Sequence, residues 1–151
     1  MSDFLYLVDQ PALTDFCAGL RGAAWLALDT EFIREQTFYP QLCLIQLATP
    51  DRIACIDPLA LPSLDPLLEL LYDPAITKVL HAAHQDLELF FHLRGAAPAP
   101  VFDTQLAALA LGQGHQLSYA ALVQQLLGVE LDKAHTRADW RRRPLAPEWL
   151  A

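Results

Sequence analysis

Apolar residues recur with two different periods along the chain, and these periods divide it into elements. The run Phe4–Val8 is short and β-prone. It is followed by apolar residues at the helical spacing i, i+3, i+4 and i+7, namely Leu13, Phe16, Cys17 and Leu20. Asp9 and Pro11 give this helix a start, and Gly22 gives it an end. Residues 4–22 therefore predict a strand and a helix before the first long apolar run.

Three strand-like runs follow closely on one another, and they are Ala24–Phe32, Leu42–Ala48 and Arg52–Ile56. The TPDR turn between the second and third runs is short enough to join antiparallel neighbours. These runs therefore predict an antiparallel meander.

Helical and extended patterns alternate in the second half of the chain. The expected elements are a helix over Ser63–Tyr72, a strand over 77–82, a helix over 84–94, an extended piece over 99–103, and helices over Thr104–Leu111 and Ser118–Leu127. Ser63 and Asp65 are candidate caps for the first of these helices, Asp103 is an N-cap candidate for the helix at Thr104, and Gly128 closes the last. A meander followed by strand–helix alternation predicts an α/β fold, with a mixed sheet and helices on both faces.

The length of 151 residues corresponds to about one domain. No stretch approaches the ~18 uninterrupted apolar residues of a membrane helix. The N-terminus MSDFLYLVDQ has no basic region and too short an apolar run for a signal peptide. We therefore expect a cytoplasmic protein that does not bind a membrane.

Cys17, Cys43 and Cys55 are odd in number and lie far apart among apolar neighbours. This pattern predicts three reduced thiols in the core. The net charge of −8 argues against general affinity for nucleic acid. It leaves open an enzyme that acts on nucleic acid, because carboxylates that hold metal ions contribute negative charge themselves.

Three carboxylates stand at positions that suggest chemistry. Asp29 and Glu31 end the first core strand, and at i and i+2 they share one face. Asp86 lies in the first turn of the helix that follows the strand over 77–82. The three carboxylates can therefore converge at the carboxyl ends of the strands. Oxygen ligands favour Mg²⁺ or Mn²⁺. Two other readings stay open: a solvent-facing strand end for the Asp-x-Glu pair, and a helix-dipole contact for Asp86.

Four stretches of the chain resemble the ribonuclease D family in order and spacing: LALDTEFIREQTFYPQLCLIQLA, TKVLHAAHQDLELF, VFDTQLAALALG and LDKAHTRADWRRRPL. The resemblance implies a ribonuclease H-like sheet and a 3′→5′ exoribonuclease with two divalent ions. By the same resemblance Asp29 bridges both ions, Glu31 holds the ion that activates water, and Asp86 supports the other. The resemblance also implies that the substrates are single-stranded 3′ ends of tRNA precursors and other small RNAs.

The family's third motif, Tyr-x-x-x-Asp, does not occur in the 151 residues. We therefore expect a single exonuclease domain over residues 1–151 that lacks its C-terminal part and, as this chain, has little activity. The absent helix is also expected to leave an apolar groove through which two copies can form a homodimer.

Half of the ten basic residues gather near the C-terminus. Lys133, Arg137 and Arg143 match basic positions of the family and are expected to contact phosphates, whereas Arg141 and Arg142 look like variable surface. The alternative is a solvated turn region.

Two further substrate contacts follow from the motifs, at His81 and Phe32. His81 matches a family position, and Phe32 can stack on the terminal base or belong to the core. His81 and His84 span a strand–helix junction with no cysteine near, which argues against zinc. Two rival functions remain: a binding or scaffold domain that cannot cut, and a DNA-directed exonuclease, which would differ in contacts to the 2′-OH.

Overall fold

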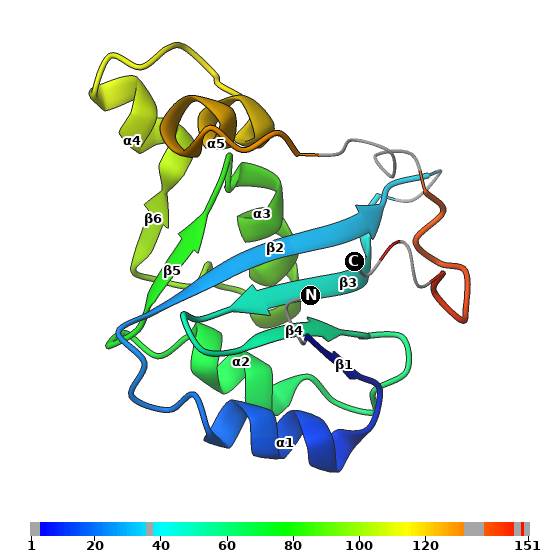
Figure 1. Ribbon diagram of the computed structural model, residues 1–151. Coiled ribbons are helices and arrows are strands. Elements are labelled where there is room, and N and C mark those ends of the chain that lie inside the picture. The colour runs from blue at the N-terminus through cyan, green and yellow to red at the C-terminus, as the bar shows by residue number, and fades with distance from the viewer. Residues whose placement is uncertain (1–3, 36–37, 132–137, 147–148, 150–151) are drawn as a thin grey trace.

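The computed structural model describes residues 4–35, 38–131, 138–146 and 149. Its strands form one six-stranded sheet, with helices packed against it (Figure 1). The strands are β1 (Leu5–Leu7), β2 (Trp25–Ile33), β3 (Gln41–Ala48), β4 (Ile53–Ile56), β5 (Thr77–Leu80) and β6 (Val101–Asp103). The helices are α1 (Gln10–Ala18), α2 (Asp65–Leu71), α3 (His84–Arg94), α4 (Thr104–Ala110) and α5 (Tyr119–Leu127).

The sheet order is β1-β4-β3-β2-β5-β6, and it mixes both strand directions. The β2-β3 and β3-β4 pairs are antiparallel, which confirms the predicted meander. The β2-β5 and β5-β6 pairs are parallel, as crossovers through helices require. The fold class predicted from the pattern is therefore confirmed. The pattern did not predict that β1 pairs parallel to β4 and closes the far edge.

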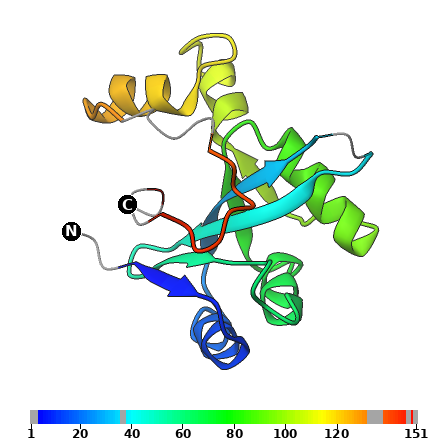
Figure 2. The same cartoon turned by 90° about the vertical axis from the view of Figure 1, so that its right-hand side faces the viewer.

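One face of the sheet carries the larger core. Alternation along β2 turns Leu26 and Leu28 to this face and leaves Ala27 and Asp29 on the other. Helices α1, α2 and α3 supply the facing apolar residues, and Figures 1 and 2 show α2 and α3 on the same side of the sheet. The three cysteines are free and buried, as the sequence predicted.

The opposite face is covered in two parts. Trp140 and Leu145 pack against Leu44 and Cys55, so the segment 138–146 covers the side nearest β3 and β4. The start of α5 adjoins the side nearest β2 and β5, where Tyr119 lines a groove. No helix in the described ranges is long and apolar enough to cross a membrane.

Most element boundaries lie within one or two residues of the prediction, and two of the differences have a clear local cause. Helix α1 ends at Ala18 rather than at Gly22, because the chain continues in tight turns whose amides bond carbonyls three residues back. Those turns keep Leu20 buried, so the helical spacing of apolar residues continues beyond the end of α1. Strand β5 ends at Leu80, since the next residues turn sharply into α3.

Candidate active site

Strand β2 extends beyond its parallel neighbour. The last register pair between β2 and β5 joins Ala27 to Val79, whereas β2 continues to Ile33. From Asp29 onward, β2 therefore has no strand on this side. A register shift in the β2-β3 pairing follows Glu31, and such irregularities commonly lie beside active sites. The open edge gives the first turn of α3 a place to approach β2.

Asp86 comes from that first turn and meets β2 at its open edge. Its side chain is buried, with 8% of its surface exposed. The hydroxyl of Thr30 donates to Asp86, with Oγ1 and Oδ1 2.5 Å apart. Thr30 stands between Asp29 and Glu31 in β2, so this bond holds Asp86 against the strand segment that carries the other two acids.

The three carboxylates lie close enough for their charges to contribute to pKa shifts within the group. Burial, and next the charge of Asp86, raise the pKa of Asp29, although hydrogen bonding from the Thr30 amide acts against the rise. Asp29 is exposed by area but lies in a groove, whose walls displace part of its hydration. Burial and the charges of both aspartates raise the pKa of Glu31 to about 7. Burial also raises the pKa of Asp86, and its hydrogen bond from Thr30 opposes that rise.

This set of donors fits a divalent cation in chemistry and charge. Each carboxylate disfavours ionisation of the others, and a hard cation between them would reverse that effect. Among the described residues, no three His, Cys, Asp or Glu side chains are close enough together to form a ready metal site. The convergence of the three acids in one ion-binding cleft therefore stays a prediction, although their charges act on one another.

His81 does not present a free ring nitrogen to a substrate. Its Nδ1 lies 2.9 Å from Oγ1 of Thr104, and its Nε2 lies 2.9 Å from the carbonyl oxygen of Leu117. A carbonyl can only accept, so Nε2 carries a proton. The ring instead ties the end of β5 to the loop before α5, and its charge lowers the pKa of Asp29. A direct substrate contact by His81 would require these two bonds to open.

A groove of about 440 Å³ lies beside Asp29 on the sheet face opposite the larger core. Its lining is mostly apolar and includes Ala48 and Val79, with His81 and Tyr119 on its wall. Phe32 is half-buried near the end of β2, so part of its ring is accessible to a base. The stacking role of Phe32 stays a prediction.

Arg143 holds a structural position rather than an open phosphate site. Its guanidinium makes a bidentate bond to Asp57, with Nε–Oδ2 2.6 Å and Nη2–Oδ1 2.7 Å. The remaining N–H groups donate to carbonyl oxygens of Cys43, Trp140 and Arg142. All five donors of the side chain are thus used within the chain. The phosphate contact expected of Arg143 therefore has no donor left in this structure. The sequence did not predict these bonds, because it could not show that Asp57 faces Arg143.

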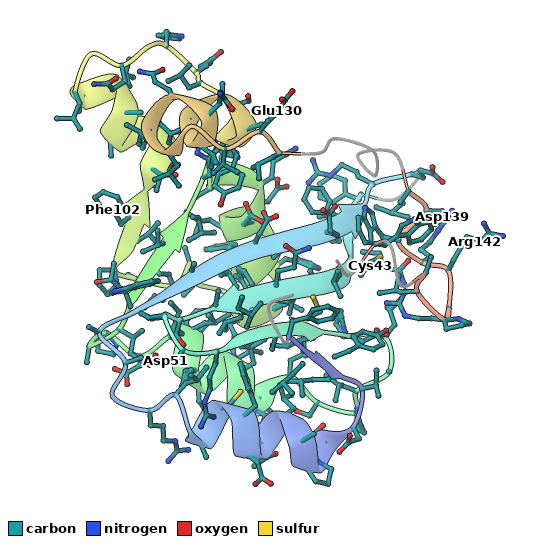
Figure 3. The ribbon with its side chains drawn as sticks, in the orientation of Figure 1. Cys43, Asp51, Phe102, Glu130, Asp139 and Arg142 are labelled. Carbon is teal, nitrogen blue, oxygen red and sulfur yellow. The ribbon has the colours of Figure 1, made fainter. Side chains whose placement is uncertain are left out.

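Of the other basic residues near the C-terminus, two lie outside the part of the chain that the structure describes and two lie within it. Lys133 and Arg137 lie outside the described residues. Arg141 pairs with Asp139 at 2.9 Å and with Glu35 at 3.4 Å, all at exposed positions. Figure 3 shows Arg142 extending from the same segment toward solvent. Arg141 and Arg142 thus have the surface character that the sequence predicted.

Two residues hold parts of the site in ways that the sequence analysis did not predict. Thr30 lies within the Asp-x-Glu pair, and its inward orientation could have been predicted from the strand alternation. Asp103 caps α4 as predicted, and it also binds the turn before α3, which no local signal reveals.

The comparisons with known proteins concern the family and the fold. A family described as 3′-5′ exonuclease matches residues 6–151. Ribonuclease D of Sphingobium indicum is 49% identical over 142 residues, which cover 92% of this chain and 36% of the relative. The chain thus spans about a third of the length of the curated relatives that it matches.

Solved structures give the same result for the fold. The crystal structure of Escherichia coli RNase D, described as an exoribonuclease involved in structured RNA processing, matches with a TM-score of 0.93 and 41% identity. That match covers 98% of this chain and 40% of the other. Brucella melitensis NrnC with bound Mg²⁺ matches with a TM-score of 0.77 and 26% identity, over 99% of this chain and 72% of the other. The resemblance to ribonuclease D seen in the motifs is confirmed, and the chain belongs to the 3′-5′ exonuclease family.

Proposed function

We propose that this protein is a metal-dependent exonuclease that removes nucleotides from the 3′ ends of RNA, and that the described residues form part of its catalytic domain. The observation that carries the proposal is that Asp29, Glu31 and Asp86 lie near enough at the open edge of β2 for their charges to act on one another. Each of these carboxyl groups has a raised pKa. Perturbed carboxylates gathered beside a groove are typical of a functional site.

The three carboxylates are the residues that would hold the metal. We propose Mg²⁺ or Mn²⁺, and two ions in the working site, with Asp29 between them, Glu31 on one and Asp86 on the other. Bound divalent ions stabilise the attacking and leaving oxygens in the hydrolysis of a phosphodiester. The protein's own contribution is to hold the carboxylates in position, and Thr30 fixes the rotamer of Asp86 through its hydroxyl. The Mg²⁺ in the NrnC structure supports the choice of metal.

The RNA substrate is proposed from the relatives and from the sequence. The relatives matched are named ribonuclease D, and small RNAs such as tRNA precursors are the expected substrates. Lys133 and Arg137 are proposed to contact phosphates, and Phe32 to stack on the terminal base. A cytoplasmic location and a homodimer remain predictions.

The test uses full-length protein and 5′-labelled single-stranded RNA with a free 3′-OH. With Mg²⁺ or Mn²⁺, we expect a ladder that shortens one nucleotide at a time from the 3′ end. EDTA should stop the reaction, and Asp29→Asn should abolish it while the variant still binds RNA in EDTA. RNA binding without any cleavage by the wild-type protein would instead favour a scaffold function.

A matched single-stranded DNA of the same sequence separates the remaining rival. The same carboxylates can hydrolyse either backbone, and only contacts to the 2′-OH distinguish them. Faster cleavage of the DNA than of the RNA would overturn the RNA assignment and leave the exonuclease assignment intact.

A further inference from the structure

We propose that Asp103 is a positioning residue for this site: it holds the turn between β5 and α3 in one conformation and thereby sets the place of Asp86. This inference rests on the proposed function, because it concerns how a metal ligand is held. Asp103 itself stands at the end of β6 and does not belong to the three carboxylates.

The Asp103 carboxylate accepts hydrogen bonds from two different parts of the chain. Its Oδ1 lies 3.0 Å from the amide nitrogen of Ala82, and its Oδ2 lies 2.9 Å from that of Ala83. Oδ1 also lies 2.8 and 3.4 Å from the amide nitrogens of Gln105 and Leu106 in the first turn of α4. Two of these four bonds cap α4, and the other two join it to the turn before α3.

The turn that Asp103 binds is strained. Ala82 has a φ of +54°, in the left-handed region that residues with a Cβ rarely adopt. Such a conformation costs free energy and persists only where surrounding contacts hold it. The two bonds from Asp103 reach Ala82 itself and the next residue, so they are the contacts that hold this turn.

The conformation of this turn determines where Asp86 lies. Helix α3 begins directly after Ala83, its N-cap, which makes no side-chain cap of its own. Asp86 is the third residue of that helix, and its oxygen lies 2.5 Å from the Thr30 hydroxyl. A hydrogen bond this short leaves little room for the helix start to shift. Asp103 also lies near Asp86: burial raises the pKa of Asp86, and the charge of Asp103 adds to that rise.

Three variants distinguish the positioning role of Asp103 from its role as the N-cap of α4 and from the effect of its charge. Asp103→Ser keeps an N-cap oxygen for α4 but is too short to reach the turn. Asp103→Asn removes the charge but keeps Oδ1 as an acceptor, so it loses only the bond to Ala83. Asp9→Ser is the matched control, since Asp9 caps α1 through the amide of Ala12 at 3.0 Å.

The experiment measures Mn²⁺ affinity by titration in full-length protein, together with amide hydrogen exchange at residues 82–87. We expect Asp103→Ser to weaken Mn²⁺ binding about tenfold, as loss of a residue that supports a metal ligand typically does. Its amides at the start of α3 should also exchange faster. Asp103→Asn should weaken binding less and speed exchange mainly at Ala83, and Asp9→Ser should change neither measurement.

Unchanged Mn²⁺ affinity and unchanged exchange in Asp103→Ser would overturn this inference alone. Equal weakening by Asp103→Asn and Asp103→Ser would also overturn it, because the charge would then account for the effect. Wild-type protein that binds no Mn²⁺ would overturn the proposed function, and this inference with it.

Discussion

Thr30 donates a hydrogen bond to Asp86 across 56 positions of sequence, with 2.5 Å between Oγ1 and Oδ1. The bond joins the residue between the two acids of β2 to the acid of α3. Thr30 is itself buried, so this hydroxyl has little water to replace its partner. The bond therefore fixes the start of α3 to the strand segment that carries the other two acids.

The variant Thr30→Val tests that relationship, because valine has nearly the same shape and no hydroxyl. It leaves an oxygen of buried Asp86 without this partner, which should lower the free energy of unfolding by about 1–3 kcal/mol. We expect kcat/KM for RNA to fall about tenfold, since the ligand loses its fixed orientation. Urea unfolding and steady-state kinetics measure the two effects. Thr30→Ser keeps the hydroxyl, and a loss of activity as large as that of Thr30→Val would contradict the role of the bond.

The pKa of Glu31 gives a prediction with a definite sign. Burial and the neighbouring charges raise this pKa from 4.5 to about 7 in the folded protein. Between those two pH values the folded state binds more protons than the unfolded state, so stability without metal falls as pH rises through that window. Ligands must be deprotonated to bind metal, so Mn²⁺ affinity should rise over the same range.

Urea unfolding in EDTA at several pH values checks the first part of that prediction. Glu31→Gln should make the fall shallower, because its amide does not titrate and only the contributions of Asp29 and Asp86 remain. Glu130→Gln, at an exposed position after α5, is the matched control and should keep the wild-type profile. A Glu31→Gln profile as steep as that of the wild type between pH 4.5 and 7 would show that another group is responsible.

The sequence was sufficient for those parts of the site that depend on local pattern. Alternation along β2 and the placement of Asp86 in the first turn of a helix both follow from short stretches, so the three carboxylates could be predicted. The contacts that hold them could not. Asp103 binds Ala82 from 21 residues away, and nothing near either residue signals that contact.

Lys78 illustrates the same limit within the core. It lies in a strand-like run but is completely buried, and its Nζ donates to the carbonyl oxygens of Asp73, Ile76 and Ala99. Burial of an ammonium group is tolerated because three acceptors receive its three protons. Their positions depend on how the chain turns before β5 and before β6, which no periodicity in the sequence records.

The pair of Asp57 and Arg143 predicts a large effect on stability. Asp57 is 1% exposed, and loss of Arg143 would leave its charge with the Tyr6 hydroxyl and the Leu59 amide. Breaking a buried pair costs about 3–5 kcal/mol, and we expect Arg143→Ala near the lower end because those two donors remain. Urea unfolding at pH 7 measures the loss. Arg21→Ala removes an exposed bridge to Glu69 and should cost about 0–1 kcal/mol.

The acid side of the stability profile tests the same pair. Burial alone would raise the pKa of Asp57, but hydrogen bonds from Arg143 and Tyr6 outweigh it and lower the pKa below 3.8. The stabilisation is therefore present above 3.8 and is lost as pH falls through the lower folded value. The difference between wild type and Arg143→Ala should shrink in that acid range. A constant difference down to the lowest pH would show that Arg143 acts through packing instead.

The basic residues near the C-terminus predict a salt dependence of RNA binding. Arg137→Ala should weaken the binding of single-stranded RNA, measured by fluorescence anisotropy in EDTA so that no cleavage occurs. If Arg137 contacts one phosphate, the slope of log K against log salt should become shallower by about 0.7. Lys133→Ala should behave in the same way. Arg142→Ala is the matched control, because Arg142 is exposed and was predicted to be ordinary surface. Equal effects of Arg137→Ala and Arg142→Ala would show that the whole segment acts only through its net charge, whereas an unchanged slope in Arg137→Ala would remove this residue from the RNA interface.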